Sequence, residues 1–260
     1  MLSRIVEVAE EAGNAILKIY AREFSVEQKA DRSPLTEADI ASHQTIIRGL
    51  TSMGSDLPVL SEESAAAPYV ERRLWDDFWM VDPLDGTKEF IGRNGEFTVN
   101  IALIRSGKPV MGVVHAPVLG TTYWANEHDA WRKSSSGKES IRCAHYSGGT
   151  LKVVASRSHA GPETEAALDT LRREVPALEL VSKGSSLKLC MVADGQAHLY
   201  PRLGSTMEWD IAAAAAVVQG AGGILTDVHG VALGYNKENL LNPWFVVRSS
   251  DSVPFPGINR

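Results

Sequence analysis

The sequence has few cysteines and no long apolar segment. Only two cysteines occur in 260 residues, Cys143 and Cys190, and no CxxC pattern is present, which argues against a disulfide framework and a structural zinc site. No stretch approaches the roughly 20 apolar residues of a membrane span. Acidic residues throughout residues 1–23 indicate an amphipathic helix rather than a signal peptide. We therefore expect a cytoplasmic protein without an integral membrane segment, at most loosely associated with the inner face of the cell membrane.

An excess of positive charge is also missing. The chain has 26 Lys and Arg against 32 Asp and Glu, a formal net charge of −6, so no global basic field attracts nucleic acid polymers. A small anionic ligand can still bind through local groups. With 44% hydrophobic residues, the chain is able to bury a full core. These properties favour a globular protein with a small-molecule partner and no nucleic acid partner.

The spacing of apolar residues predicts α and β elements mixed over two lobes. The predicted helices lie at residues 2–19, 36–50, 160–175, 186–194 and 210–221. Thr36 and Asp39 have the T-x-x-D arrangement of a capping box at the start of the second helix. Short apolar runs between residues 57 and 125 predict strands, with a hairpin turn at Gly107-Lys108.

A polar segment separates the two predicted lobes. The segment RKSSSGKES, residues 132–140, is interpreted as a surface loop because it lacks apolar residues. Strands and helices resume with LKVVASRSH at residue 151. We therefore expect an N-terminal lobe of residues 1–145 and a C-terminal lobe of residues 146–260.

Acidic side chains recur where an apolar strand ends or a helix begins. Glu62 and Glu63 follow PVLS, Asp82 and Asp85 follow or lie just beyond FWMV, and Asp210 lies in MEWDIAAAAA. Strand ends in layered α/β folds are where ligands collect. Carboxylates that converge there repel one another unless cations neutralise them, and oxygen ligation suits Mg²⁺ or Mn²⁺. The sequence thus predicts a metal site that holds an anionic phosphate.

The segment DPLDGT, residues 82–87, adds detail to this prediction. Pro83 has a fixed φ and helps to turn the chain, so that both aspartates and the Leu84 carbonyl can face one pocket. Gly86 lets the backbone approach a ligand closely, and its amide and that of Thr87 can cradle phosphate oxygens. The Thr87 hydroxyl can orient a water. This pattern is typical of metal-assisted hydrolysis of a phosphate ester.

Each acidic segment also has a simpler interpretation when it is taken alone. Residues 82–87 contain the usual turn formers. Glu62 and Glu63 fit a solvated loop, and Asp210 and Asp39 fit the first turn of a helix. These interpretations do not explain why the acids follow strongly apolar segments.

The segments SEES, VDPLDGTKEF and EWDIAAAAA resemble the motifs of a known family. It comprises the Mg²⁺-dependent, lithium-sensitive phosphomonoesterases that include inositol monophosphatase, fructose-1,6-bisphosphatase and the 3'(2'),5'-bisphosphate nucleotidases. Within this inositol monophosphatase superfamily, FIGRNGEFTVNIALI, VVASRSH, SKGSSLKLC and LNPWFV are most similar to the bacterial CysQ-type nucleotidases. The likeness extends over nearly the whole chain.

The resemblance implies an αβαβα sugar-phosphatase fold and a specific reaction. The expected activity is Mg²⁺-dependent removal of the 3'-phosphate from 3'-phosphoadenosine 5'-phosphate, linked to sulfate assimilation, without a covalent intermediate. Two or three Mg²⁺ ions are expected, with Mn²⁺ as a substitute. Inhibition by lithium and a monomeric state are further expectations.

The resemblance also assigns roles to residues. The metal ligands it implies are Glu62, Asp82, the Leu84 carbonyl, Asp85 and Asp210. Glu62 and Thr87 resemble the pair that orients and deprotonates the attacking water. Asp39 is similar to the acid that supports the threonine, and Lys29 to a loop lysine near the metals.

The substrate contacts are expected on both lobes. The implied residues are Glu62, Leu84, Asp85, Gly86, Thr87, Ser156, Arg157, His159, Lys183, Ser185, Lys188 and Asp210. Those beyond residue 150 offer cations and hydroxyls for the 5'-phosphate and the ribose. Alternatively, Ser158 begins a helix and the two lysines are solvated. His115, His198 and Trp209 are interpreted as packing residues.

Two other functions stay open at this level. The same metal core would serve an inositol monophosphatase or another sugar-phosphate phosphatase, because it contacts only the phosphate that all these substrates share. A catalytically silent sensor of metal or nucleotide is the alternative from another class. Glu62, Thr87 and the metal aspartates are all present, which favours an enzyme.

Overall fold

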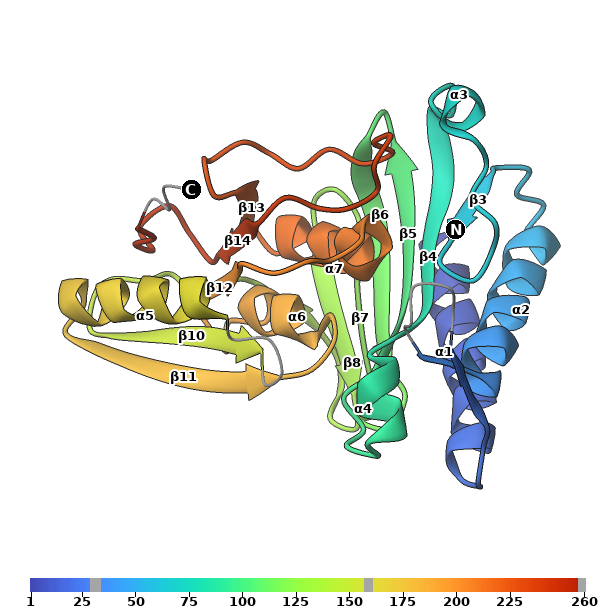
Figure 1. Ribbon diagram of the computed structural model, residues 1–260, viewed down its shortest axis with the longest axis horizontal. Coiled ribbons are helices and arrows are strands. Elements are labelled where there is room, and N and C mark those ends of the chain that lie inside the picture. Colours follow the sequence, from blue (N-terminus) through green and yellow to red (C-terminus); the bar gives the residue numbers. More distant parts are fainter. Residues whose placement is uncertain (29–33, 157–160, 257–260) are drawn as a thin grey trace.

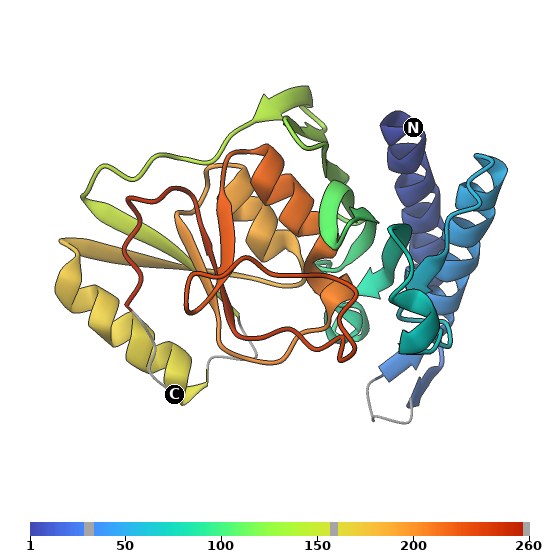
Figure 2. The ribbon, with the colours of Figure 1, turned by 90° about the horizontal axis from the view of Figure 1, so that it is seen from above.

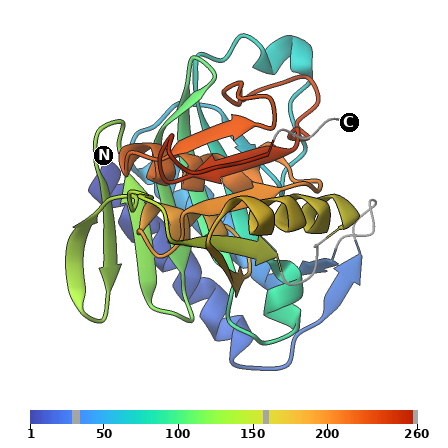
Figure 3. The same cartoon turned by 90° about the vertical axis from the view of Figure 1, so that its left-hand side faces the viewer.

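The computed structural model stacks the chain in five layers, in the order αβαβα (Figure 1). It describes residues 1–28, 34–156 and 161–256. From one outer face to the other, the helical layers are α1 (Leu2–Tyr20) with α2 (Glu37–Ser52), then α6 (Leu187–Ala193) with α7 (Glu208–Gly220), and then α5 (Pro162–Glu174). Figure 2 shows the same order from above, and Figure 3 views the stack from the α5 side. This is the layered fold that the family resemblance implies.

The first sheet has seven strands that follow one another in chain order. They are β3 (Val59–Ser61), β4 (Asp77–Asp85), β5 (Thr98–Arg105), β6 (Lys108–Ala116), β7 (Thr121–Ala125), β8 (Ala130–Ser134) and β9 (Gly137–Ile141). Only β3 and β4 are parallel; the other neighbours are antiparallel. The short helices α3 (Tyr69–Arg72) and α4 (Thr87–Ile91) lie on either side of β4 in the sequence.

The second sheet has five strands in the order β11-β10-β12-β14-β13. Their bounds are β10 (Thr150–Ser156), β11 (Ala177–Lys183), β12 (Leu199–Arg202), β13 (Ile224–Asp227) and β14 (Phe245–Arg248). β10 runs parallel to β11 and β12, and β14 is antiparallel to β12 and β13. A separate ribbon pairs β1 (Val26–Gln28) with β2 (Pro34–Thr36).

Both faces of the first sheet are covered, which explains why most side chains of its central strands are apolar. Side chains alternate between the two faces of a strand. Phe78 and Met80 of β4 therefore join the core that contains α6 and α7, while Trp79 and Val81 join the core that contains α1 and α2. The site at the end of β4 is thus carried by a strand that is fixed from both sides.

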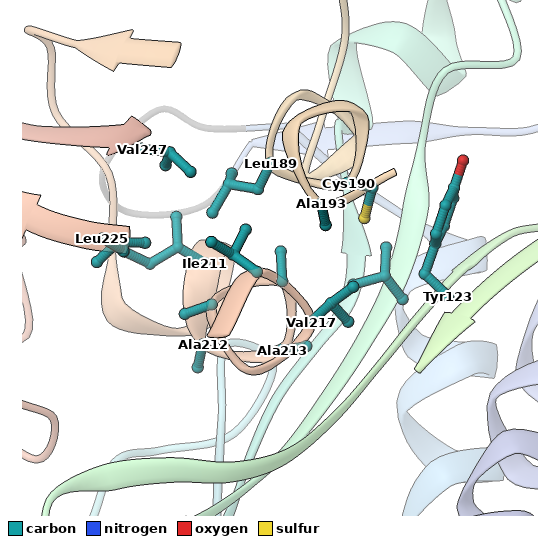
Figure 4. Close-up of a cluster of buried hydrophobic side chains, with 14 of the residues drawn as sticks. Tyr123, Leu189, Cys190, Ala193, Ile211, Ala212, Ala213, Val217, Leu225 and Val247 are labelled. Carbon is teal, nitrogen blue, oxygen red and sulfur yellow. The ribbon is translucent and has the colours of Figure 1, made fainter. Parts of the chain in front are cut away.

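Helix α7 is the shared core of the two sheets (Figure 4). Its small residues permit close approach: a Cβ on Gly112 of β6 would lie 2.2 Å from the Ala213 carbonyl oxygen. Ile211 packs in the same cluster as Phe78 of the first sheet and Val247 of the second. The chain passes from one sheet to the other between residues 141 and 150, yet the two sheets share the core around α6 and α7. The division into two lobes at residue 145 stays a prediction.

The N-terminal signals of α2 act as the sequence predicts. The Thr36 hydroxyl accepts a hydrogen bond from the Ala38 amide at 3.2 Å, and Asp39 Oδ2 accepts one from the Thr36 amide at 2.7 Å. The capping box is confirmed. These bonds satisfy amides that the first helical turn leaves without a partner.

The prediction of a surface loop at residues 132–140 is wrong. This segment forms most of the β8–β9 hairpin at the edge of the first sheet, with Ser134 paired to Gly137 across the turn. Between the buried ends Ala130 and Ile141, its side chains are half-buried or exposed. An edge strand with solvated side chains needs no apolar alternation, so the polar sequence hid it.

No helix in the described part of the chain is both long and apolar enough to cross a bilayer.

Candidate active site

The end of β4 contains a β-bulge that aims both aspartates at one place. Asp82 pairs with Asn100 of β5, but Asp85 pairs with Thr98, so β4 uses one more residue than its partner over this interval. Without the bulge, residues three apart would point to opposite faces. The Ser42 hydroxyl donates a 2.6 Å hydrogen bond to the Pro83 carbonyl oxygen and holds the bulge from α2.

Three carboxylates converge next to this bulge. Glu62, Asp82 and Asp210 each offer an oxygen, and these oxygens all lie within 4.8 Å of one another. Glu62 is fixed to β4 by its amide, which donates to the Val81 carbonyl oxygen at 3.1 Å. Asp210 caps α7, because its Oδ2 accepts from the Met207 amide at 2.9 Å. The acidic cluster therefore lies where the ends of β3 and β4 meet the start of α7.

Burial and mutual repulsion disfavour the ionised forms of the carboxylates in the acidic cluster. Burial raises the pKa of Asp82 well above its ordinary value, and the Glu62, Asp85 and Asp210 carboxylates raise this pKa further. Burial and then Asp85 raise the pKa of Asp210 in the same way. A hard cation would remove both effects, because it neutralises the mutual repulsion and accepts oxygen ligands. The donor set therefore fits a divalent metal such as Mg²⁺.

Asp85 is held from the other half of the chain. Its Oδ2 accepts three hydrogen bonds, from Ser185 Oγ at 2.5 Å, from the Ser186 amide at 2.6 Å and from Ser186 Oγ at 2.9 Å. Among the described residues, no donor contacts its Oδ1. The arrangement leaves one oxygen of the carboxylate directed away from its protein partners, as a metal ligand requires.

Thr87 is positioned by Asp39, the supporting acid that the family resemblance implies. Its hydroxyl lies 3.4 Å from Asp39 Oδ1 and 3.4 Å from the Leu84 carbonyl oxygen. Asp39 is itself fixed, because Thr36 donates to its other oxygen. Gly86 precedes Thr87 with a φ of +91°, a conformation that favours glycine. The start of α4 is thus set beside the carboxylates.

These residues line one cavity of about 380 Å³. Its acidic part is formed by Glu62, Asp82, Asp85 and Asp210, and its walls include Leu84, Gly86, Thr87, Ser185 and Ser186. Beyond them, Lys188, Tyr200, Arg202, Ser205 and Thr206 line the same cavity. The cavity therefore combines carboxylates with three cationic side chains, the exposed Lys88 and the more deeply placed Lys188 and Arg202.

The cationic part of the cavity is built from buried groups. Lys188 is only 8% exposed, and its Nζ donates to the Ser185 carbonyl oxygen at 2.7 Å. Burial lowers the pKa of Lys188 to about 8. Arg202 Nε is buried without an acceptor among the described residues. A buried donor without a partner costs about 1–3 kcal/mol, so an anion at this place would stabilise the arrangement.

Not every substrate contact expected from the sequence reaches the cavity. Lys183 does not line it; its Nζ pairs with Glu96 Oε1 at 3.2 Å. Lys29, Arg157 and His159 lie outside the described residues, as does the side chain of Ser156.

Several residues of the site escape the sequence analysis. Ser42 and Ser186 act through hydrogen bonds to residues 24 to 101 positions away. Arg202 forms part of the cavity wall. The only signal for Ser186 is its place in SKGSSLKLC, and none marks Arg202. His115 and Trp209, in contrast, are a buried and a partly buried packing residue, as expected. His198 is half-buried and accepts the Lys152 amide at its Nδ1.

The profile of the inositol monophosphatase family matches residues 1–252. The chain belongs to the inositol monophosphatase family. Among curated members, the 3'(2'),5'-bisphosphate nucleotidase CysQ of Salmonella typhimurium is 47% identical over 250 residues, which cover 95% of this chain and 99% of the relative. The same protein name belongs to a relative from Haemophilus influenzae that is 35% identical and matches 99% of this chain and 96% of the relative.

Solved structures of the inositol monophosphatase family share this fold. CysQ from Bacteroides thetaiotaomicron has a TM-score of 0.85 and 43% identity, and the match covers 95% of this chain and 96% of that one. The IMPase of Thermotoga maritima has a TM-score of 0.73 at 22% identity and covers 94% of this chain and 90% of its own, which supports the fold alone. Members of this family are metal-dependent phosphatases, in agreement with the acidic cluster.

Proposed function

We propose that this protein is a Mg²⁺-dependent phosphomonoesterase that converts 3'-phosphoadenosine 5'-phosphate to AMP and phosphate. One observation carries the proposal: a single cavity joins the carboxylate cluster of Glu62, Asp82 and Asp210 to the cationic side chains of Lys188 and Arg202. The names of its curated relatives support the same activity.

The two parts of the cavity fit the two phosphates of this substrate. The scissile phosphate belongs beside the carboxylates, where bound cations offset the negative charge. A second phosphate would pair with Lys188 and supply the acceptor that Arg202 Nε lacks. An inositol monophosphate has no second anionic group, so it would leave both cations without a counter-charge.

Glu62, Asp82, the Leu84 carbonyl, Asp85 and Asp210 would hold two or three Mg²⁺ ions, with Mn²⁺ as a substitute. When bound, these ions make a water more acidic and stabilise the charge that develops on the phosphate. Thr87 orients the attacking water through its hydroxyl, which Asp39 fixes from behind. Glu62 accepts a proton from this water. Gly86 and Thr87 present their amides to the phosphate, and no covalent phosphoenzyme forms.

The proposed substrate is the by-product of sulfate activation. We therefore place the enzyme in the cytoplasm, as a monomer that consumes this by-product.

Phosphate release by the purified protein in Mg²⁺ tests the proposal. Four substrates are compared under matched conditions: 3'-phosphoadenosine 5'-phosphate, 3'-AMP, inositol 1-phosphate and fructose 1,6-bisphosphate. The first is expected to have the highest kcat/KM. The 3'-AMP arm isolates the second phosphate, because the two nucleotides share the scissile group. Preference for inositol 1-phosphate, or equal use of both nucleotides, would contradict the proposal.

The KM for 3'-phosphoadenosine 5'-phosphate is expected to rise as the pH increases through about 8. The pKa of Lys188 lies at about 8, so the side chain is charged below this pH and neutral above it. Only the charged form attracts a phosphate, and affinity should therefore fall by up to about tenfold per pH unit above the pKa. Steady-state kinetics between pH 7 and 9.5 measure this rise.

Two controls separate Lys188 from other titrating groups. With 3'-AMP, which lacks the 5'-phosphate, the KM should not show the same rise. In Lys188→Arg the cation persists at every pH tested, so the rise in KM for 3'-phosphoadenosine 5'-phosphate should disappear. An unchanged rise in either control would show that another group is responsible.

A further inference from the structure

The first residues of β5 and the extended residues just before it present three polar side chains on one face. Glu96, Thr98 and Asn100 are two residues apart, so they project to the same side of the extended chain. All three are buried. Buried polar groups require hydrogen-bond partners, and here the partners lie on the other half of the chain, in residues 183–186.

Glu96 fixes the first part of this segment. Its Oε1 lies 3.2 Å from Lys183 Nζ, and its Oε2 accepts the Gly184 amide at 2.8 Å. The backbone contact is close, because a Cβ on Gly184 would lie 2.8 Å from the Glu96 carbonyl oxygen. Only glycine fits here without a shift of the neighbouring chain.

Thr98 and Asn100 fix the second part. Thr98 Oγ1 lies 2.5 Å from Ser185 Oγ, and Asn100 Nδ2 donates to Ser186 Oγ at 2.9 Å. Successive side chains on one face of the strand thus meet successive residues of the segment. We call the six residues Glu96, Thr98, Asn100, Gly184, Ser185 and Ser186 the polar ladder.

The backbone of the ladder is strained at one residue. Ser185 has a φ of +52°, a conformation that costs a non-glycine residue of the order of 1–3 kcal/mol. Lys188 Nζ donates to the Ser185 carbonyl oxygen from the first turn of α6. Contacts on both sides therefore hold Ser185 in a conformation that it would not adopt alone.

The ladder ends on the carboxylate of Asp85 and on the backbone carbonyl of Asp210. An ionised carboxylate only accepts hydrogen bonds, so the Ser185 hydroxyl donates to Asp85 Oδ2. The Thr98 hydroxyl lies between the Ser185 oxygen, at 2.5 Å, and Asn100 Oδ1, at 3.0 Å. Ser186 contacts the same oxygen through its amide, and its hydroxyl also lies 2.5 Å from the Asp210 carbonyl oxygen. Ser186 therefore joins two of the proposed metal-ligating residues.

We propose that the polar ladder sets the orientation of Asp85, so that Thr98, Asn100, Ser185 and Ser186 are positioning residues for metal binding. The inference rests on the proposed function in that it takes Asp85 as a metal ligand. It assigns the Ser185 hydroxyl to this carboxylate rather than to the nucleotide. It also makes the affinity for metal depend on contact between the two halves of the chain.

Direct binding of Mn²⁺, followed by electron paramagnetic resonance, tests the proposal without catalysis. Ser186→Ala should raise the dissociation constant of Mn²⁺ by about 10- to 100-fold, as the loss of a group that orients a ligand does elsewhere. Ser249→Ala is the matched control. Ser249 is as buried as Ser186, at 3% against 2% residue exposure, but its hydroxyl has no hydrogen-bond partner among the described residues.

Thr98→Val provides the second variant, because it removes a hydroxyl that touches neither Asp85 nor a metal. It should weaken Mn²⁺ binding in the same direction, and a higher Mg²⁺ concentration should restore most of the lost turnover. A purely structural role would lower stability and leave Mn²⁺ affinity unchanged. If Ser186→Ala and Thr98→Val bind Mn²⁺ as Ser249→Ala does, the proposal is overturned.

The outcome is separable from that of the proposed function. Weakened Mn²⁺ binding in the ladder variants supports the ladder, even if the unaltered protein fails to hydrolyse 3'-phosphoadenosine 5'-phosphate. Hydrolysis by the unaltered protein together with unchanged Mn²⁺ binding in the variants supports the function and rejects the ladder.

Discussion

Replacement of Glu62 by glutamine is expected to lower kcat by about 10²–10⁴-fold, the range typical of general base catalysis. The amide keeps an oxygen for a cation but cannot take a proton from the attacking water. Thr87→Ala should lower kcat within the same range, because it removes the hydroxyl that Asp39 holds beside the carboxylates. Steady-state kinetics at saturating Mg²⁺ separate this loss from the smaller expected change in KM.

Thr87→Ser is the control for this pair of variants. It retains the hydroxyl while it removes a methyl group, so most of the turnover should remain. If Thr87→Ala were as active as Thr87→Ser, the hydroxyl would have no role in orienting the water. An active Glu62→Gln would require another proton acceptor.

Asp82→Asn is expected to abolish the response to Mg²⁺ and to reduce turnover by about 10³-fold or more, since bound metals supply several kcal/mol of transition-state stabilisation. Asp82 is the most buried carboxylate of the cluster, at 1% exposure. In the unaltered protein, Mg²⁺ at 100 times its dissociation constant adds about 2.7 kcal/mol of stability. This corresponds to a rise in Tm of about 5–10 °C for a chain of this size, and the variant should lose it.

The same substitution should change how metal-free stability depends on pH. A carboxyl whose folded-state pKa is raised, as it is for Asp82, binds its proton more tightly in the folded state. Its contribution to stability is complete below the unfolded-state pKa and is lost as the pH rises through the folded-state pKa. Without metal, Asp82→Asn should therefore gain stability relative to the unaltered protein as the pH rises.

Asp77→Asn is the matched control at the opposite end of β4. Asp77 pairs with Arg105, which lowers its pKa, so its contribution has the opposite sign. Thermal unfolding with and without Mg²⁺ should show a normal metal response in this variant. A normal response in Asp82→Asn as well would remove Asp82 from the metal centre.

Local signals in the sequence predicted the five longer helices and the acidic convergence, but not the short helices α3 and α4. The capping box of Thr36 and Asp39 lies within four residues, so its sequence pattern already contains both partners. The acids at Glu62, Asp82 and Asp210 follow apolar segments that the core must bury, and burial brings their ends together. Pro83 marked a turn, although the bulge that re-aims Asp85 depends on pairing with β5.

Contacts between distant segments could not be predicted in this way. Ser186 and Asp85 are 101 residues apart, and no local pattern states that one will orient the other. The alternation of Glu96, Thr98 and Asn100 is visible in the sequence, but it predicts only a polar face, not its partner. The β8–β9 hairpin was missed for the opposite reason: its local pattern is polar because an edge strand is solvated on most sides.

The central place of α7 has a consequence for protein synthesis. The chain leaves the ribosome from its N-terminus, and α7 begins only at Glu208. Until then, the face of the first sheet that carries Phe78 and Met80 lacks the helix that packs on β4, β5, β6 and β7, and Asp210 is absent from the acidic cluster. The nascent chain therefore carries an open apolar surface until α7 is made, and the phosphatase cannot become active before Asp210 has been synthesised.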